Sequence, residues 1–192
     1  MIPKRISAKI FTTEPEEAVD HDAFIALFHE FIREKTVEGL LLDVADYAHV
    51  PEGPGVMLIG HDVDYGIDQT AGRAGLLAVK KRIEGGELAA LLDETVRLGL
   101  LAAKAVEGNG SAGVQFAPGA VQVQFIDRLA HENSDAGFGS VKGELEALAK
   151  RLFGEGAQVE RADADEPRRP LAATLSGAGG GAIDDLVARL SS

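Results

Sequence analysis

The sequence predicts an α+β fold in which a ferredoxin-like βαββα unit occurs twice, the two units together forming an α/β sandwich. Strand and helix patterns follow one another in the same order in both halves of the chain. Short matching segments also recur about 115 residues apart, as in a tandem repeat with small loop insertions. A single mixed sheet with helices on both faces is the alternative fold.

The matching segments define two predicted repeats. In the first repeat they are AKIF, Phe24, GLLLDVAD, a Pro-rich turn, VMLIG ending at Gly60, and Ile67-Asp68. In the second they are VQVQF, Phe138, GAQVERAD, another Pro-rich turn, LAATLSG ending at Gly177, and Ile183-Asp184. We therefore predict one repeat at 1–107, another at 114–192 and a Gly-rich linker at 108–113. The two repeats are free to pack as one compact domain.

The first elements of the chain have clear patterns. Apolar residues alternate along 6–11, which predicts a half-buried strand. Apolar residues at three- and four-residue spacing along 24–32 then predict a helix with one apolar face. Asp20 or Asp22 is the expected cap of this helix, because carboxylates accept hydrogen bonds from the free amides of a first turn.

The middle of the chain predicts two strands, an ambiguous segment and a long helix. The apolar run at 40–42 is typical of a strand covered on both faces, and 56–59 predicts a second buried strand. Residues 72–82 fit either a strand or a helix, and their glycines favour the strand. The helix at 87–106 is apolar nearly all round, which predicts central burial or a subunit contact.

The second half of the chain predicts five further features. A hairpin turn is expected at 117–120, because Pro and Gly there separate two apolar runs. A helix follows at 140–153, with apolar residues on one side. Strands at 158–162 and 171–175 and a terminal helix at 183–190 complete the pattern.

Composition limits the classes of function. The 192 residues include 31 acidic and 19 basic side chains, giving a net charge of −12 that disfavours nucleic acids and anionic membranes. There is no cysteine, which excludes thiol nucleophiles, disulfides and cysteine-ligated metals and fits a reducing compartment. No segment has the pattern of a signal peptide or a membrane span. We predict a cytoplasmic protein without nucleic-acid or membrane partners.

The densest group of chemically capable side chains follows the strand that ends at Gly60. The segment reads GHDVDYGID, and His61, Asp62 and Asp64 are the predicted ligands of a divalent metal. Asp62 and Asp64 share one face of an extended backbone, so His61 joins them only if the chain turns after Gly60. The second repeat has only small residues near the corresponding positions, Ala178, Gly179 and Gly181.

Four other residues extend this predicted ligand-binding site. Tyr65 belongs to the same segment, and Asp43, Asp46 and His49 leave the neighbouring predicted strand. We expect them to converge on one edge, because sites in α/β proteins are commonly built at strand ends.

Two other polar features receive structural interpretations. The Gly-rich segment 177–181 lies between a strand and a helix, where backbone amides can bind phosphate. It lacks the Lys and Ser/Thr of a P-loop, so a flexible joint is the preferred interpretation. His131 lies in an acidic loop and is predicted to be solvated.

Two functions remain open from the sequence. The first is a non-catalytic protein that forms a homo-oligomer or binds a small-molecule ligand, since the helix at 87–106 has little polar surface. The alternative is a metal-assisted hydrolase or lyase with its site in 61–68, using His61, Asp62 and Asp64. The sequence does not decide between binding and catalysis.

Overall fold

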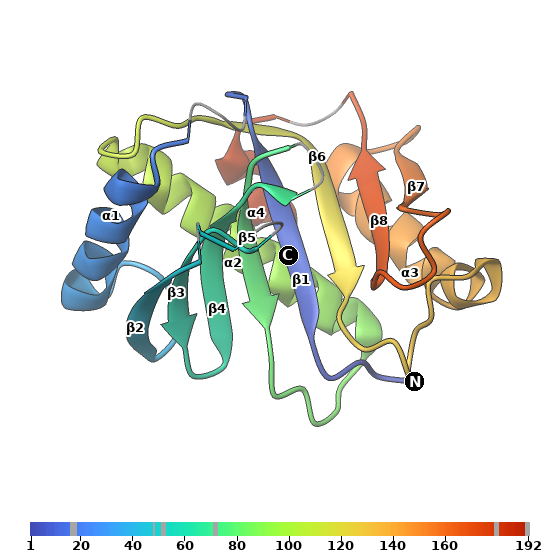
Figure 1. Cartoon of the computed structure of the whole chain (residues 1–192). Helices are drawn as coiled ribbons and strands as arrows, with labels where there is room; N and C mark the ends of the chain where they lie inside the picture. The colour runs from blue at the N-terminus through green and yellow to red at the C-terminus, as the bar shows by residue number, and fades with distance from the viewer. Residues whose placement is uncertain (16–18, 48, 51–52, 71–72, 179–180, 191–192) are drawn as a thin grey trace.

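A computed structural model describes residues 1–15, 19–47, 49–50, 53–70, 73–178 and 181–190. In these residues, four helices pack on one face of a single eight-stranded antiparallel sheet (Figure 1). The strands are β1 (Ile6–Thr12), β2 (Leu41–Asp46), β3 (Val56–Gly60), β4 (Val63–Asp68), β5 (Gly75–Lys80), β6 (Phe116–Phe125), β7 (Gln158–Ala162) and β8 (Leu171–Ser176). The helices are α1 (His21–Glu34), α2 (Leu88–Asn109), α3 (Asp135–Phe153) and α4 (Ile183–Leu190).

The α+β class is confirmed, but a pair of ferredoxin-like units is not what the chain forms. The strand order is β2-β3-β4-β5-β1-β6-β8-β7, with every neighbouring pair antiparallel. The alternative, a mixed sheet with helices on both faces, is also wrong, because all strand pairs are antiparallel and the described helices lie on one face. The order strand, helix, strand, strand does occur twice, but the β4–β5 hairpin separates β3 from β1 whereas β8 pairs directly with β6.

The two halves of the chain share the sheet. β1 pairs with β6 at its centre, in a register that places Ile6 opposite Phe125 and Ile10 opposite Val121. The predicted linker at 108–113 contains the end of α2, which stops where Gly110 takes a left-handed φ of 74°. One matching pair falls on different elements, since Ile67-Asp68 ends in β4 and Ile183-Asp184 begins α4. Duplication therefore stays a prediction.

The first helix forms as its sequence predicts. Asp20 is its cap, and its carboxylate accepts hydrogen bonds from the amides of Asp22 and Ala23. Phe24 and Phe28 lie one turn apart, are buried, and meet edge to face with ring centroids 5.5 Å apart. This aromatic face packs α1 onto β2 and β3.

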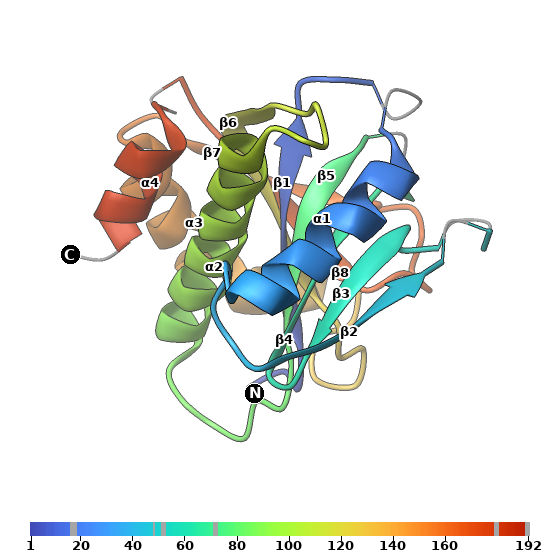
Figure 2. The same cartoon turned by 90° about the vertical axis from the view of Figure 1, so that its left-hand side faces the viewer.

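The long helix α2 is the centre of the helical layer. It packs on β1, β5 and β6 and is covered by α3 and α4 (Figure 2). Leu92, Val96 and Leu100 are fully buried there. Its apolar circumference is thus explained by central burial, one of the two predicted options, and gives no support to a subunit contact. Self-association stays a prediction.

The structure corrects two of the sequence predictions and resolves the ambiguous one. The run at 40–42 belongs to the edge strand β2, where Leu42 is 55% exposed, because only β3 lies beside it. The hairpin predicted at 117–120 is wrong: β6 continues through Pro118 and Gly119, and β1 changes register opposite them. The ambiguous segment 72–82 contains the strand β5, as its glycines favoured.

The two faces of the sheet differ in chemistry. On β1, Ile6, Ala8 and Ile10 are fully buried on the helical side, whereas Ser7 and Lys9 alternate onto the face without helices. We call this second side the helix-free face. Among the described helices, none has the length and apolar character needed to cross a membrane.

Candidate functional site

The predicted His/Asp segment forms the β3–β4 turn and the strand after it. His61 and Asp62 occupy the turn, and Nδ1 of His61 lies 2.8 Å from Oδ1 of Asp62. Both side chains are exposed. The amide of His61 donates to the carbonyl of Leu40, so the turn is held against the start of β2. The chain does turn after Gly60, as a shared site would need.

Asp64 and Tyr65 are consecutive residues of β4, so their side chains project to opposite faces of the sheet. Oδ1 of Asp64 accepts hydrogen bonds from Nζ of Lys81 at 2.7 Å and from the amide of Gly60 at 3.0 Å. Tyr65 is buried among the helices, and its hydroxyl donates to the carbonyl of Glu38 at 2.9 Å. Burial raises the pKa of Tyr65 well above its ordinary value, and the nearby Glu38 charge adds to this rise.

Of the three residues expected from the neighbouring strand, Asp46 and His49 lie away from the turn. β2 runs antiparallel to β3, so Asp46 pairs with Val56 at the opposite end of the hairpin from Gly60. His49 follows β2 and is exposed beyond that same far end. Asp43 lies nearer the turn, opposite Ile59, but it is exposed and its carboxylate accepts from the amide of Val44. Asp46 and His49 would have reached the turn only if β2 and β3 were parallel.

The structure brings together no three potential His, Asp or Glu metal ligands in the part of the chain that it describes. Lys81 already neutralises Asp64, and only His61 and Asp62 of the predicted metal set are in contact. A metal-assisted hydrolase or lyase stays a prediction without support from this arrangement.

The Gly-rich segment 177–181 is only partly visible, because Gly179 and Gly180 lie outside the described residues. At its end, the amide of Ala182 donates to the carboxylate of Asp185, 3.2 Å away. A Cβ on Gly181 would come within 2.5 Å of the same carboxylate. A carboxylate therefore occupies the start of α4, which disfavours a phosphate there.

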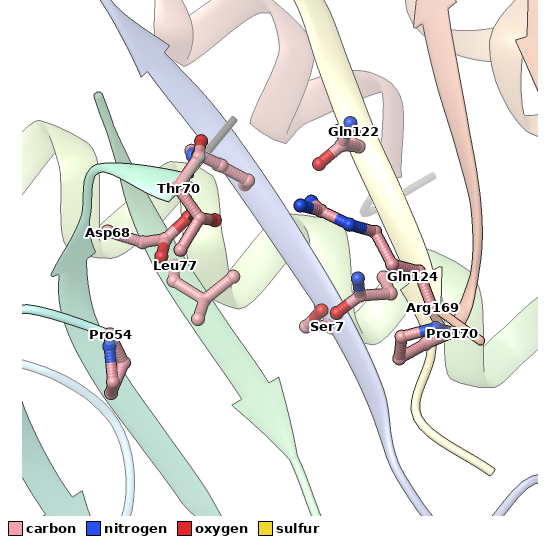
Figure 3. Close-up of a pocket in the computed structure, with 10 residues that line it drawn as sticks. Ser7, Pro54, Asp68, Thr70, Leu77, Gln122, Gln124, Arg169 and Pro170 are labelled. Carbon is pink, nitrogen blue, oxygen red and sulfur yellow. Dashed lines mark hydrogen bonds and ion pairs between the residues drawn. The ribbon is translucent and has the colours of Figure 1, made fainter. Parts of the chain in front are cut away.

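A different group of residues lines a pocket of about 370 Å³ on the helix-free face (Figure 3). The floor comes from β1, β5 and β6, one wall from the end of β4 and the segments beside it, and the other from the loop before β8. Its lining residues are Ser7, Lys9, Pro54, Asp68, Thr70, Leu77, Gln122, Gln124, Arg169 and Pro170. Asp68 belongs to the predicted segment 61–68, but none of these residues is a predicted ligand.

A buried ion pair lies in the first wall of this pocket. Nζ of Lys9 is 2.5 Å from Oδ2 of Asp68, and the two residues are 4% and 5% exposed. Lys9 also donates to the carbonyl of Thr70 at 3.0 Å, and the Thr70 hydroxyl donates to the same Asp68 oxygen at 2.8 Å. The pair is thus enclosed in hydrogen bonds, as buried charges require.

Gly75 makes this ion pair possible. β5 lies between β1 and β4, and Gly75 is the residue of β5 opposite Asp68. A Cβ on Gly75 would meet Cγ of Lys9 at 2.8 Å and Cε at 3.0 Å. The lysine side chain therefore crosses an intervening strand over the one position that has no side chain of its own.

The other side of the pocket is also polar, but fewer of its side chains form hydrogen bonds within the protein. The β1–β6 register places Gln122 opposite Lys9 and Gln124 opposite Ser7. The Arg169 side chain extends from the loop before β8 across β6 and ends between the two glutamines (Figure 3). Within the described residues, the side chains of Ser7, Gln122 and Gln124 have no protein hydrogen-bond partner, so they remain available to a ligand.

The sequence does contain a signal for this pocket. Polar residues alternate with apolar ones along both central strands, as in the segments AKIF and VQVQF. Such alternation indicates one solvated sheet face. It does not say that a lysine will be buried there, because burial depends on Asp68 and on Gly75 from two other strands.

Comparison with protein-family models, with curated proteins and with solved structures finds no match for this chain. Function is therefore inferred from the pocket itself.

Proposed function

We propose that this protein binds a small polar molecule in the pocket on the helix-free face. The observation that carries the proposal is the buried ion pair of Lys9 and Asp68 in the pocket wall. Removing two charges from water costs several kcal/mol per ion, and apolar residues of similar size are often more stabilising. A charged pair at the centre of a sheet is therefore better suited to recognition than to stability.

The size and lining of the pocket support the same proposal. A volume of about 370 Å³ lies at the small end of the range for ligand sites, roughly 300–1,000 Å³. Leu77, Pro54 and Pro170 contribute apolar surface, and the amides of Gln122 and Gln124 contribute both donors and acceptors. Ligand sites commonly combine an apolar surface with a few polar groups that fix orientation.

Binding without catalysis is the form of the proposal that the lining supports. The lining residues that the structure describes include no histidine, the commonest general base. The hydroxyl of Thr70 donates to Asp68, but that carboxylate is already neutralised by Lys9. Thr70 therefore lacks the strong neighbouring base that would activate it as a nucleophile.

A ligand screen by NMR tests this proposal. A mixed panel of small acids, amines, amides and alcohols is added to labelled protein while the side-chain amide signals of Gln122 and Gln124 are observed. Compounds that bind should shift both signals and should lose at least tenfold in affinity in Gln122→Ala. The control is Gln158→Ala, which removes an exposed glutamine on the edge strand β7. If no compound shifts the two signals, or both variants weaken binding equally, the proposal is wrong.

A further inference from the structure

The charged residues that line the pocket have partners of opposite charge within the protein. Among the described lining residues, Lys9, Asp68 and Arg169 carry charges. Lys9 and Asp68 form the ion pair of 2.5 Å, and Nη1 of Arg169 lies 3.7 Å from Oδ2 of Asp163. An ionic ligand would lose its hydration on entering this pocket and would find the charges of the lining compensated. The pairing therefore disfavours a charged ligand.

The lining groups that lack partners are uncharged. Within the described residues, the side chains of Ser7, Gln122 and Gln124 form no hydrogen bond with the protein. A hydroxyl and a carboxamide can each both donate and accept hydrogen bonds. We propose that the ligand is an uncharged molecule held through groups of the same kind, carboxamides or hydroxyls; this inference rests on the proposed function.

Ser7 supports this inference because its hydroxyl is buried without a partner. The residue is 2% exposed and lies on the central strand β1, opposite Val79 on one side and Gln124 on the other. Burying a hydroxyl that makes no hydrogen bond costs free energy, so alanine would be at least as stable at this position. A ligand that hydrogen-bonds to the hydroxyl removes this cost. Recognition therefore explains Ser7 better than stability does.

The two glutamines present both halves of their amides to the pocket. Gln122 and Gln124 follow each other at a spacing of two on β6, so their side chains project onto the same face (Figure 3). A glutamine amide can pair with a carboxamide through two hydrogen bonds, because each group offers a carbonyl and an N–H. A carboxylate offers no donor and an ammonium group offers no acceptor, so either ion leaves one half of the amide unpaired. Leu77 and Pro54 offer apolar surface to the remainder of the ligand.

The test compares molecules of similar shape and different charge by NMR titration at pH 7 and constant ionic strength. One set is benzamide, benzoate and benzylamine, and the other is glucose and glucuronate. The observed signals are the side-chain amides of Gln122 and Gln124. In at least one set we expect the neutral molecule to bind at least tenfold more tightly than its ionic analogues, because an ion leaves polar groups of the site unpaired. The set that responds distinguishes a carboxamide ligand from a hydroxyl ligand.

The variant Ser7→Ala separates recognition from folding. We expect it to reduce the affinity for the better neutral probe at least fivefold. Its melting temperature should be no lower than that of the wild type, because the native hydroxyl has no protein hydrogen bond to lose. A role in stability alone would give the opposite pair of results, an unchanged affinity and a lowered melting temperature, and would overturn the inference.

Matched glutamine variants locate the ligand. Gln124→Leu removes the amide at similar side-chain size and should reduce the affinity at least tenfold, as followed on the Gln122 signal. Gln158→Leu makes the same change at an exposed position of the edge strand β7 and should change the affinity less than twofold. Backbone amide spectra establish that each variant is folded. Equal affinities in the two leucine variants would overturn the inference.

Three further outcomes separate this inference from the proposed function. If in both sets an ion binds within tenfold of its neutral analogue, or more tightly, the uncharged class is wrong and the pocket stands. The same holds if none of the five probes shifts the Gln122 and Gln124 signals while another small molecule does. If no compound of any charge shifts these signals, both the uncharged class and the proposed function are wrong.

Discussion

Nζ of Lys9 lies 2.5 Å from Oδ2 of Asp68 although the two residues belong to strands that are not neighbours in the sheet. The contact spans 59 positions of sequence and ties the centre of the sheet to the end of β4. It does so above Gly75, whose missing side chain leaves the passage open. The stability of this wall of the pocket therefore depends on Lys9, Asp68 and Gly75 together.

The first prediction concerns the free energy of unfolding of single and double variants of this pair. Lys9→Met and Asp68→Leu should each destabilise the protein by about 3–5 kcal/mol, because each leaves one buried charge without its partner. The double variant should lose far less than the sum of the two, since it leaves neither charge. Urea denaturation of all four proteins measures the coupling. Additive losses would show that the two side chains do not interact.

The second prediction concerns Gly75. In Gly75→Ala the new methyl group would lie 2.8 Å from Cγ of Lys9 and from the carbonyl oxygen of Ile10. We expect a loss of about 1–3 kcal/mol in the free energy of unfolding, typical of overpacking. Gly85→Ala is the control, because a methyl group there meets no atom within 4 Å. Thermal denaturation of both variants checks the difference, and equal melting temperatures would contradict it.

The third prediction concerns acid conditions and His131. This residue was predicted to be solvated, but it is 4% exposed, its Nε2 lies 2.9 Å from the carbonyl of Met1, and its buried Nδ1 has no partner among the described residues. Burial lowers its pKa because the imidazolium is poorly solvated, and the nearby terminal amino group lowers it further.

The sign of the pH dependence follows from that lowered pKa. The unfolded chain takes up a proton on His131 near pH 6.5, where the folded chain does not. Stability is therefore full above about pH 6.5 and decreases as the pH falls towards the folded pKa. Urea denaturation between pH 5 and 8 should show this slope reduced in His131→Gln and unchanged in His29→Gln, whose side chain is exposed on α1. An identical slope in all three proteins would exclude His131 as its source.

The fourth prediction concerns Tyr65. Tyr65→Phe removes the hydrogen bond to the carbonyl of Glu38 and should cost about 0.5–1.5 kcal/mol at neutral pH. Because the pKa of Tyr65 is raised in the folded state, the wild-type protein is most stable below about pH 10 and loses stability above it. Denaturation at pH 8 and above pH 10 should show a smaller alkaline loss in the variant. A variant with the wild-type alkaline loss would contradict the raised pKa.

Local patterns in the sequence predicted the elements well where packing agrees with periodicity. α1 begins at its capping Asp20, and α2 and α4 follow the predicted apolar segments closely. The sheet order was not predictable in the same way, because a repeated strand–helix–strand–strand pattern does not say whether another hairpin lies between its strands. The β4–β5 hairpin does so in the first half only, where it lies between β3 and β1 in the sheet.

The prediction of the site was limited in the same way, because local patterns do not show which distant residues meet. His61 and Asp62 do meet, as their spacing and a turn after Gly60 allow. The expected convergence of Asp46 and His49 with them fails because β2 and β3 are joined by a short connection and run antiparallel, so β2 ends far from Gly60. The pocket on the helix-free face depends on contacts between strands far apart in the chain. Alternation marked Lys9 as a residue of the opposite face but could not place Asp68 beside it.

The central position of β1 has a consequence for how the chain is made. Both neighbours of β1 are synthesised after it, since its first residue, Ile6, pairs with Lys80 on one side and Phe125 on the other. A nascent chain that has reached Lys80 can pair one edge of β1 but leaves the other open, where foreign strands can add. We expect folding to be slow for a chain of this size, since its central pairing is so non-local. We therefore expect aggregation through the open edge of β1 to be most favoured after the ribosome has released β5 and before it has released β6.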